Sequence, residues 1–260
     1  MLHNSQKDFI RRHIGPSERD QEKMLKDLNF KSLDEFINST IPEKIQFKGE
    51  LNIGEPNSEY EALRKLKAIS KKNQIYSNFI GMGYYGTYTP YVILRNILEN
   101  PGWYTSYTPY QPEVAQGRLE MLLNFQQMIV DFTGMDIANA SLLDEGTAAA
   151  EAMGLSHRLN KSDSNLVFVS ENCHPQTIDV IQTRAEPMGL KVLVGNEDKV
   201  LEQLKEDIVC GILQYPGTLG DIKDPSEAIS KIHKKNGKAI LACDLLALAK
   251  LKTPRELGAD

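Results

Sequence analysis

The chain has 260 residues, and its 30 Lys and Arg against 35 Asp and Glu give a formal net charge of −5. A hydrophobic share of 41% and a charged share of 25% match ordinary globular proteins and exclude collagen, a disulfide scaffold and wholesale disorder. The mild acidity and the lack of an apolar run near ~18 residues predict neither a nucleic-acid nor a membrane partner.

The chemistry of the chain's start and of its cysteines indicates the compartment. Residues 1–8 lack the apolar core of a signal peptide, and Asp8 is an acid that transit peptides usually avoid. Cys173, Cys210 and Cys243 form no CxxC pair, which is typical of reduced, buried thiols and predicts no metal site. We expect the cytoplasm of a bacterium, or the mitochondrial matrix if the source is eukaryotic.

Residues 1–75 are predicted to form a helical, solvated arm. Ser17 precedes acids at the positions where a helix begins, and Ser32 followed by Glu35 fits a capping box for a second short helix. Residues 58–72 are predicted to form a third helix with one apolar face.

Residues 76–112 have a different composition and form a predicted active-site loop region. Between residues 76 and 110 lie eight of the ten tyrosines, the only tryptophan, three prolines and four glycines. Such loops are usually binding surfaces, although aromatic side chains that pack one domain on another are an alternative. A GxGxxG pattern at residues 81–86 is not followed by a helix start or by an acid ~20 residues later, which excludes a dinucleotide site.

Residues 113–260 are predicted to be a large α/β domain that is incomplete. A long amphipathic helix ends at Gly134, and short apolar runs then alternate with helical patterns. This order predicts a mainly parallel sheet with helices on both faces, whose active site lies at the carboxyl ends of the strands. The predicted strands are 165–169, 191–194, 208–213 and 238–243, and the predicted helices are 176–188, 199–206 and 226–235.

Three features of this domain are candidates for a cofactor site. Gly146 and Thr147 open an alanine-rich helix whose amino terminus favours an anion such as a phosphate, with a plain helix cap as the alternative. His174 lies just beyond a predicted strand, where it has either a structural or a functional role. Asp244 ends a later strand, and a protonated pyridine nitrogen is a suitable partner for such a carboxylate.

The order of these features suggests a fold-type-I pyridoxal-phosphate enzyme. Such enzymes bind the cofactor through a lysine a couple of dozen residues after the aspartate. The chain ends 16 residues after Asp244, and Lys250 and Lys252 come too soon. We therefore expect that this chain lacks the Schiff-base lysine and stops before the fold is complete.

Longer motifs resemble the glycine cleavage system P-protein, and the resemblance covers essentially the whole chain. The matching stretches are residues 9–16, 84–87, 99–105, 107–113, 116–120 and 142–152. The resemblance implies a fold-type-I transferase-like domain from the amino-terminal half of the family, whose carboxyl-terminal half or subunit carries the lysine and the pyridoxal 5′-phosphate. It also implies an oligomer that decarboxylates glycine and transfers the aminomethyl group to the lipoyl arm of H-protein.

The resemblance further implies roles for individual residues. Tyr84 and Tyr85 would be the catalytic contribution of the active-site loop, whereas Gly146, Thr147, His174 and Asp244 would be remnants of a cofactor pocket. The walls of the substrate channel would include Thr87, Thr89, Tyr107, Tyr110, Gln111 and Glu113. Two alternatives are a non-catalytic scaffold or regulatory subunit of the same complex, and an independent pyridoxal-phosphate amino acid decarboxylase with a lysine beyond residue 260.

Overall fold

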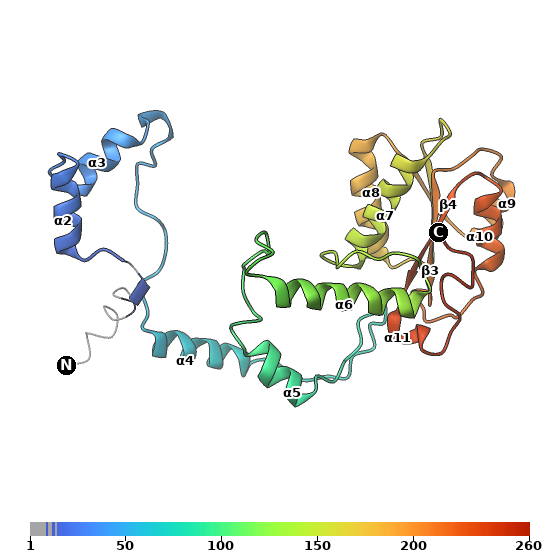
Figure 1. Ribbon diagram of the computed structural model, residues 1–260, viewed down its shortest axis with the longest axis horizontal. Helices are drawn as coiled ribbons and strands as arrows, with labels where there is room; N and C mark the ends of the chain where they lie inside the picture. Colours follow the sequence, from blue (N-terminus) through green and yellow to red (C-terminus); the bar gives the residue numbers. More distant parts are fainter. Residues whose placement is uncertain (1–8, 10–11, 14) are drawn as a thin grey trace. The chain divides into compact units, whose positions relative to one another are not determined.

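The computed structural model describes residue 9, residues 12–13 and residues 15–260 (Figure 1). The prediction made for residues 1–8, and positions 10, 11 and 14 of the first matching stretch, lie outside the described residues. The chain divides into two compact units, Met1–Ser77 and Asn78–Asp260. None of the described helices is long and apolar enough to cross a lipid bilayer.

The first unit is helical, as its serine caps predict. It contains α2 (Glu18–Asp27), α3 (Leu33–Thr40), the short η1 (Glu43–Ile45) and α4 (Glu59–Ser70). Ser17 forms a complete capping box with Asp20, but the box predicted at Ser32 is only half formed. The Ser32 hydroxyl accepts from the amide of Glu35, whereas the Glu35 carboxylate accepts from the amide of Lys31 instead of that of Ser32. The Glu35 carboxylate therefore bonds the amide one residue before the cap residue.

The second unit begins with a loop region and then the helix predicted to end at Gly134. The loop contains α5 (Tyr91–Ile93) and the π-helical η2 (Leu94–Leu98), and α6 spans Gln116–Thr133. Gly134 has a φ of +70°, and its amide donates to the carbonyl of Val130. A left-handed glycine is the common way to end a helix, because it carries no Cβ penalty in this conformation.

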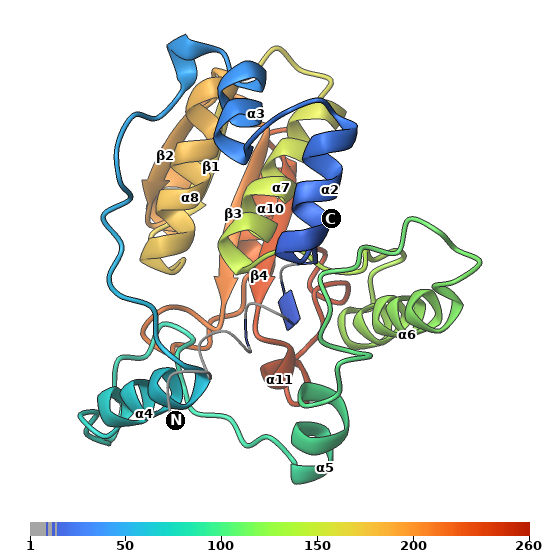
Figure 2. The ribbon, with the colours of Figure 1, turned by 90° about the vertical axis from the view of Figure 1, so that its left-hand side faces the viewer.

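A four-stranded parallel sheet forms the centre of this unit (Figure 2). Its strands are β1 (Leu166–Ser170), β2 (Lys191–Gly195), β3 (Cys210–Tyr215) and β4 (Lys238–Cys243), in the order β2-β1-β3-β4. All three strand pairs are parallel, so the predicted βαβ pattern is confirmed. The predicted third strand starts two residues early, because the amide of Ile208 donates to the carbonyl of Lys235 outside the sheet.

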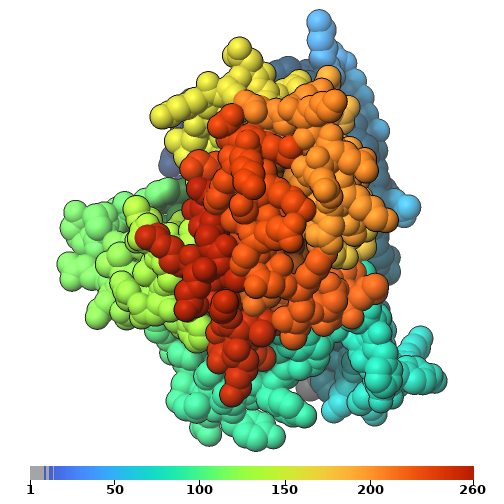
Figure 3. Space-filling view, turned by 90° about the vertical axis from the view of Figure 1, so that its right-hand side faces the viewer, coloured from blue at the N-terminus to red at the C-terminus, as the bar shows by residue number. Residues whose placement is uncertain are grey.

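Helices cover both faces of the sheet, as the α/β pattern predicts. Figure 1 shows α7 (Glu145–Leu159) and α8 (Pro175–Ala185) on one side of the sheet, and α9 (Glu197–Gln203) and α10 (Ser226–His233) on the other. The short η3 (Glu186–Met188) follows α8, and α11 (Leu245–Leu248) follows β4. Figure 3 shows the outer surface of the α9–α10 side, together with the residues after β4, in orange and red.

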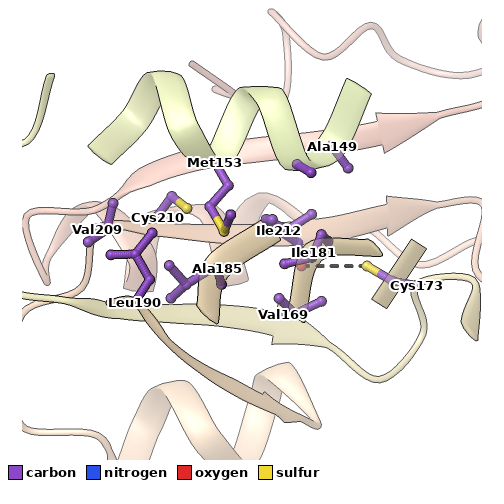
Figure 4. Packing of buried hydrophobic residues seen from close by; sticks show 12 residues of the cluster. Ala149, Met153, Val169, Cys173, Ile181, Ala185, Leu190, Val209, Cys210 and Ile212 are labelled. Carbon is purple, nitrogen blue, oxygen red and sulfur yellow. Dashed lines mark hydrogen bonds between the residues drawn. The ribbon is translucent and has the colours of Figure 1, made fainter. Parts of the chain in front are cut away.

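Each face of the sheet has its own hydrophobic core, because successive strand residues point to opposite faces. On the α7–α8 face, Met153 and Ile181 pack with Val169 of β1 (Figure 4), and Val167 of β1 belongs to the same buried cluster. On the α9–α10 face, Phe168 of β1 is fully buried in a cluster that includes Ile232. Strand β1 therefore contributes side chains to both cores.

The outer edge of β4 carries no further strand among the described residues. The chain returns to this edge at Asp260, whose amide donates to the carbonyl of Ala239 over 2.9 Å. The Asp260 carboxylate accepts from the amide of Ala239 and from the ammonium group of Lys238. The rest of this edge, Ile240 to Cys243, is partly exposed.

The three cysteines should react slowly with thiol reagents while the chain is folded. Burial raises the pKa of Cys173 and of Cys210 to about 12, and that of Cys243 to about 11. Because the thiolate is the reactive form, we expect labelling by Ellman's reagent at mildly alkaline pH to be at least ~100-fold slower than in concentrated urea. Cys243 should react first, since it alone is only partly buried. One thiol that reacts at the unfolded rate would contradict this burial.

Candidate active-site edge of the sheet

A tight turn lies against the loops that leave the carboxyl ends of β1, β3 and β4. We call residues 81–85 the tyrosine turn, because they include Tyr84 and Tyr85. Gly81, Met82 and Gly83 have φ values of +71°, +55° and +80°, and the amide of Tyr84 donates to the carbonyl of Gly81 over 2.9 Å. Glycine adopts this left-handed backbone without strain. The glycines of the GxGxxG pattern therefore shape a turn and do not start a helix.

Asp244, at the end of β4, holds Tyr85. The Tyr85 hydroxyl donates to Oδ2 of Asp244 over 2.6 Å, although the two residues are 159 positions apart. The other carboxylate oxygen, Oδ1, accepts from the amide of Leu246 over 2.9 Å and caps α11. The hydrogen bond to Asp244, followed by burial and the negative charge of the carboxylate, raises the pKa of Tyr85. The phenol therefore stays neutral.

His174, beyond β1, is buried and fixed from one side. Its Nδ1 lies 2.9 Å from the hydroxyl oxygen of Thr218, and this hydroxyl donates to the carbonyl of Asn172 over 2.9 Å. Because the Thr218 proton is already used, its oxygen accepts, and Nδ1 of His174 carries the proton that is donated. In the neutral ring, Nε2 is left as an acceptor.

The tyrosine turn contacts the other side of this histidine. A Cβ added to Gly83 would lie 3.3 Å from Nε2 and 3.9 Å from Cδ2 of His174, so the turn backbone comes close to the Nε2 edge of the imidazole ring. The neighbouring Tyr84 hydroxyl donates to Oε1 of Gln176, in the first turn of α8. The structure thus brings four residues of the prediction together at one edge, namely Tyr84, Tyr85, His174 and Asp244.

The start of α7 is built for capping and helix packing. The Asp144 carboxylate accepts from the amide of Thr147 over 2.7 Å, and this hydrogen bond lowers the pKa of Asp144. Gly146 is buried, and a Cβ at this position would lie 3.2 Å from Cγ2 of Val180 in α8. Gly146 therefore allows α7 and α8 to approach closely, and Thr147 supplies the amide that Asp144 caps.

These residues do not fit pyridoxal phosphate. At the start of α7, the ionised carboxylate of Asp144, next to Glu145, would repel a phosphate group. At the strand ends, the Asp244 carboxylate that would face a pyridine nitrogen already accepts from Tyr85, and the turn at Gly83 comes close to Nε2 of His174. No step of chemistry through the cofactor is therefore assigned to this edge. Among the described residues, no group of three or more His, Cys, Asp or Glu is arranged to hold a metal ion.

The residues expected to line a substrate channel are all exposed to solvent. They lie in the long loop between the tyrosine turn and α6, and Tyr110 is 85% exposed. The six residues are Thr87, Thr89, Tyr107, Tyr110, Gln111 and Glu113.

Three residues that the sequence did not indicate also belong to this region. Gln176 and Thr218 contact Tyr84 and His174, and the Pro-Gly-Thr that follows β3 could have signalled a functional loop. Glu197, at the start of α9, is buried and accepts from Ser170 over 2.7 Å and from Lys223 over 3.0 Å. Burial alone would raise its pKa, but these hydrogen bonds outweigh burial and lower it. It is a structural acid that nothing in its local sequence distinguishes.

The fold and the strand-end edge define the class of the fold-type-I transferase-like α/β proteins. The chain belongs to the glycine cleavage system P-protein family, whose model matches residues 11–260. It is 80% identical over its whole length to a glycine dehydrogenase (decarboxylating) from Pelagibacter ubique strain HTCC1062, and 54% identical over 97% of its length to one from Stutzerimonas stutzeri strain A1501. The chain spans 27% and 26% of these relatives, or about a quarter of their length.

A solved structure shows the same fold. It is a crystal structure of glycine decarboxylase (P-protein) of the glycine cleavage system in inhibitor-bound form, with a TM-score of 0.84 and 29% sequence identity. The match covers 95% of this chain and 56% of that one. The similarity therefore extends over nearly all of the elements described above.

Proposed function

We propose that this chain is the amino-terminal portion of a glycine dehydrogenase (decarboxylating). The full-length protein would decarboxylate glycine with pyridoxal phosphate and pass the aminomethyl group to the lipoyl arm of H-protein. The observation that carries this proposal is the 80% identity to the Pelagibacter ubique relative over every residue of this chain. We place the full-length protein in the cytoplasm of a bacterium, or in the mitochondrial matrix of a eukaryote, and expect it to be an oligomer.

In this proposal the chain supplies the fold and the tyrosine turn, while the cofactor and its lysine belong to the rest of the protein. The strand-end edge supports this division, because Asp244 already accepts from Tyr85 and the turn at Gly83 comes close to His174. Tyr84 and Tyr85 remain 50% and 53% exposed. Such rings can exclude water from a neighbouring site while their hydroxyls stay hydrogen-bonded.

The isolated chain should therefore be inactive. We expect the purified 260-residue chain, mixed with one equivalent of pyridoxal phosphate, to show no specific imine absorbance and no glycine-dependent exchange of CO2. A protein that joins residues 1–260 of this chain to the remainder of the Pelagibacter ubique relative, here called the joined protein, is the positive control. A borohydride-reducible imine in the isolated chain, together with CO2 exchange, would overturn this division of roles.

A further inference from the structure

The tyrosine turn needs support from outside itself. Met82 adopts a φ of +55°, a left-handed conformation that is unfavourable for a residue with a side chain. Inside the turn, backbone hydrogen bonds run from the amide of Tyr84 to the carbonyl of Gly81 over 2.9 Å and from the amide of Tyr85 to the carbonyl of Gly83 over 3.2 Å. The flanking Phe79 and Tyr88 are 92% and 100% exposed, so neither anchors the loop by burial.

Hydrogen bonds to the turn come from two of the three strand ends, and the third strand end lies close by. Beyond β1, His174 lies under Gly83, and Gln176 accepts from the Tyr84 hydroxyl. Beyond β3, the carbonyl of Thr218 lies 3.9 Å from the position of a Cβ on Gly81. At the end of β4, Asp244 accepts from the Tyr85 hydroxyl over 2.6 Å.

We propose that His174, Gln176 and Asp244 form a seat that fixes the tyrosine turn, and that Asp244 is the positioning residue for Tyr85. The polar groups at the strand ends thus hold a piece of the chain itself in place of a small molecule. This inference rests on the proposed function in one respect, which is that Tyr84 and Tyr85 contribute to the glycine site of the full-length protein.

The seat also determines what Tyr85 can offer to a neighbouring group. A phenol has one proton to donate, and Tyr85 gives it to Asp244. The raised pKa of Tyr85 agrees with a hydroxyl that remains protonated. Toward a substrate, Tyr85 therefore presents its ring and the lone pairs of its oxygen, so it accepts hydrogen bonds and does not act as a general acid.

Hydrogen–deuterium exchange of the joined protein tests the seat without reference to activity. We expect the amides of Tyr84 and Tyr85, which are hydrogen-bonded inside the turn, to exchange about tenfold faster in Tyr85→Phe and in Asp244→Ala, because a hydrogen bond to a charged group is lost. Asp244→Asn, which keeps a neutral acceptor and the shape of the α11 cap, should lie between these variants and the wild type. The matched controls, Tyr88→Phe and Asp136→Asn, change an exposed tyrosine of the same loop and a carboxylate paired with Arg255, and should leave these amides unchanged.

A double-mutant cycle measured on kcat and KM for glycine separates positioning from general destabilisation. If Asp244 acts through Tyr85, Asp244→Ala should lower kcat several-fold in the wild type but no further in the Tyr85→Phe background. Unchanged exchange in Tyr85→Phe, or additive losses in the cycle, would overturn the seat and leave the proposed function standing. Faster exchange with unchanged kcat would support the seat, but it would contradict a role of Tyr84 and Tyr85 in turnover.

Discussion

Replacing Phe168 with alanine should lower the free energy of unfolding by about 3–5 kcal/mol. Phe168 lies in the middle of β1 and is fully buried among side chains of the α9–α10 face. Its removal loses the transfer free energy of the aromatic ring and leaves a cavity that the surrounding strands cannot fill. Urea denaturation of the 260-residue chain, followed by far-ultraviolet circular dichroism, measures the loss.

The matched control for this change is Phe79→Ala. Phe79 is 92% exposed, so its removal should change the free energy of unfolding by less than about 0.5 kcal/mol. Equal losses in the two variants would show that the α9–α10 core does not stabilise the sheet as its burial indicates.

Replacing both Tyr84 and Tyr85 with alanine should lower the turnover of the joined protein by about 100-fold. The substitution removes two half-exposed rings and the hydrogen bonds that fix them to Gln176 and Asp244. Displacements of about 1 Å at a reacting site can cost a factor of this size. The measurement is glycine-dependent CO2 exchange, with gel filtration to follow assembly.

Tyr88→Ala is the control for this prediction, because Tyr88 lies in the same loop, is fully exposed and should not affect turnover. If the double variant keeps both its assembly and its turnover, the tyrosine turn does not contribute to the catalytic site. The chain would then serve as a scaffold or regulatory part of the complex.

Much of the fold could be predicted because it depends on local patterns. Short apolar runs separated by helical periodicity gave the parallel strands in their correct places, and Gly134 marked the end of α6. The errors lie at boundaries such as Ile208, where an apolar residue continues the run but its amide bonds outside the sheet. Periodicity reports which residues are apolar, whereas hydrogen bonds decide where a strand begins.

The candidate site could be predicted only in part. His174 and Asp244 were found because a polar residue after an apolar strand stands out. Their contact with the tyrosine turn joins segments that are far apart in the sequence, and no local pattern encodes such a contact. Gly146 and Thr147 show a different difficulty, since a glycine needed for helix packing and one needed near a phosphate look alike in sequence.

The outer edge of β4 has a consequence for handling the chain in solution. A strand with unpaired backbone groups is a template for another strand, and two copies can join through such edges and aggregate. At the start of β4, Lys238 and Asp260 place charges that discourage this pairing, but Ile240 to Cys243 carry none. Aggregation of the isolated chain should therefore increase with its concentration, and it should increase further when the charge on Lys238 or Asp260 is removed.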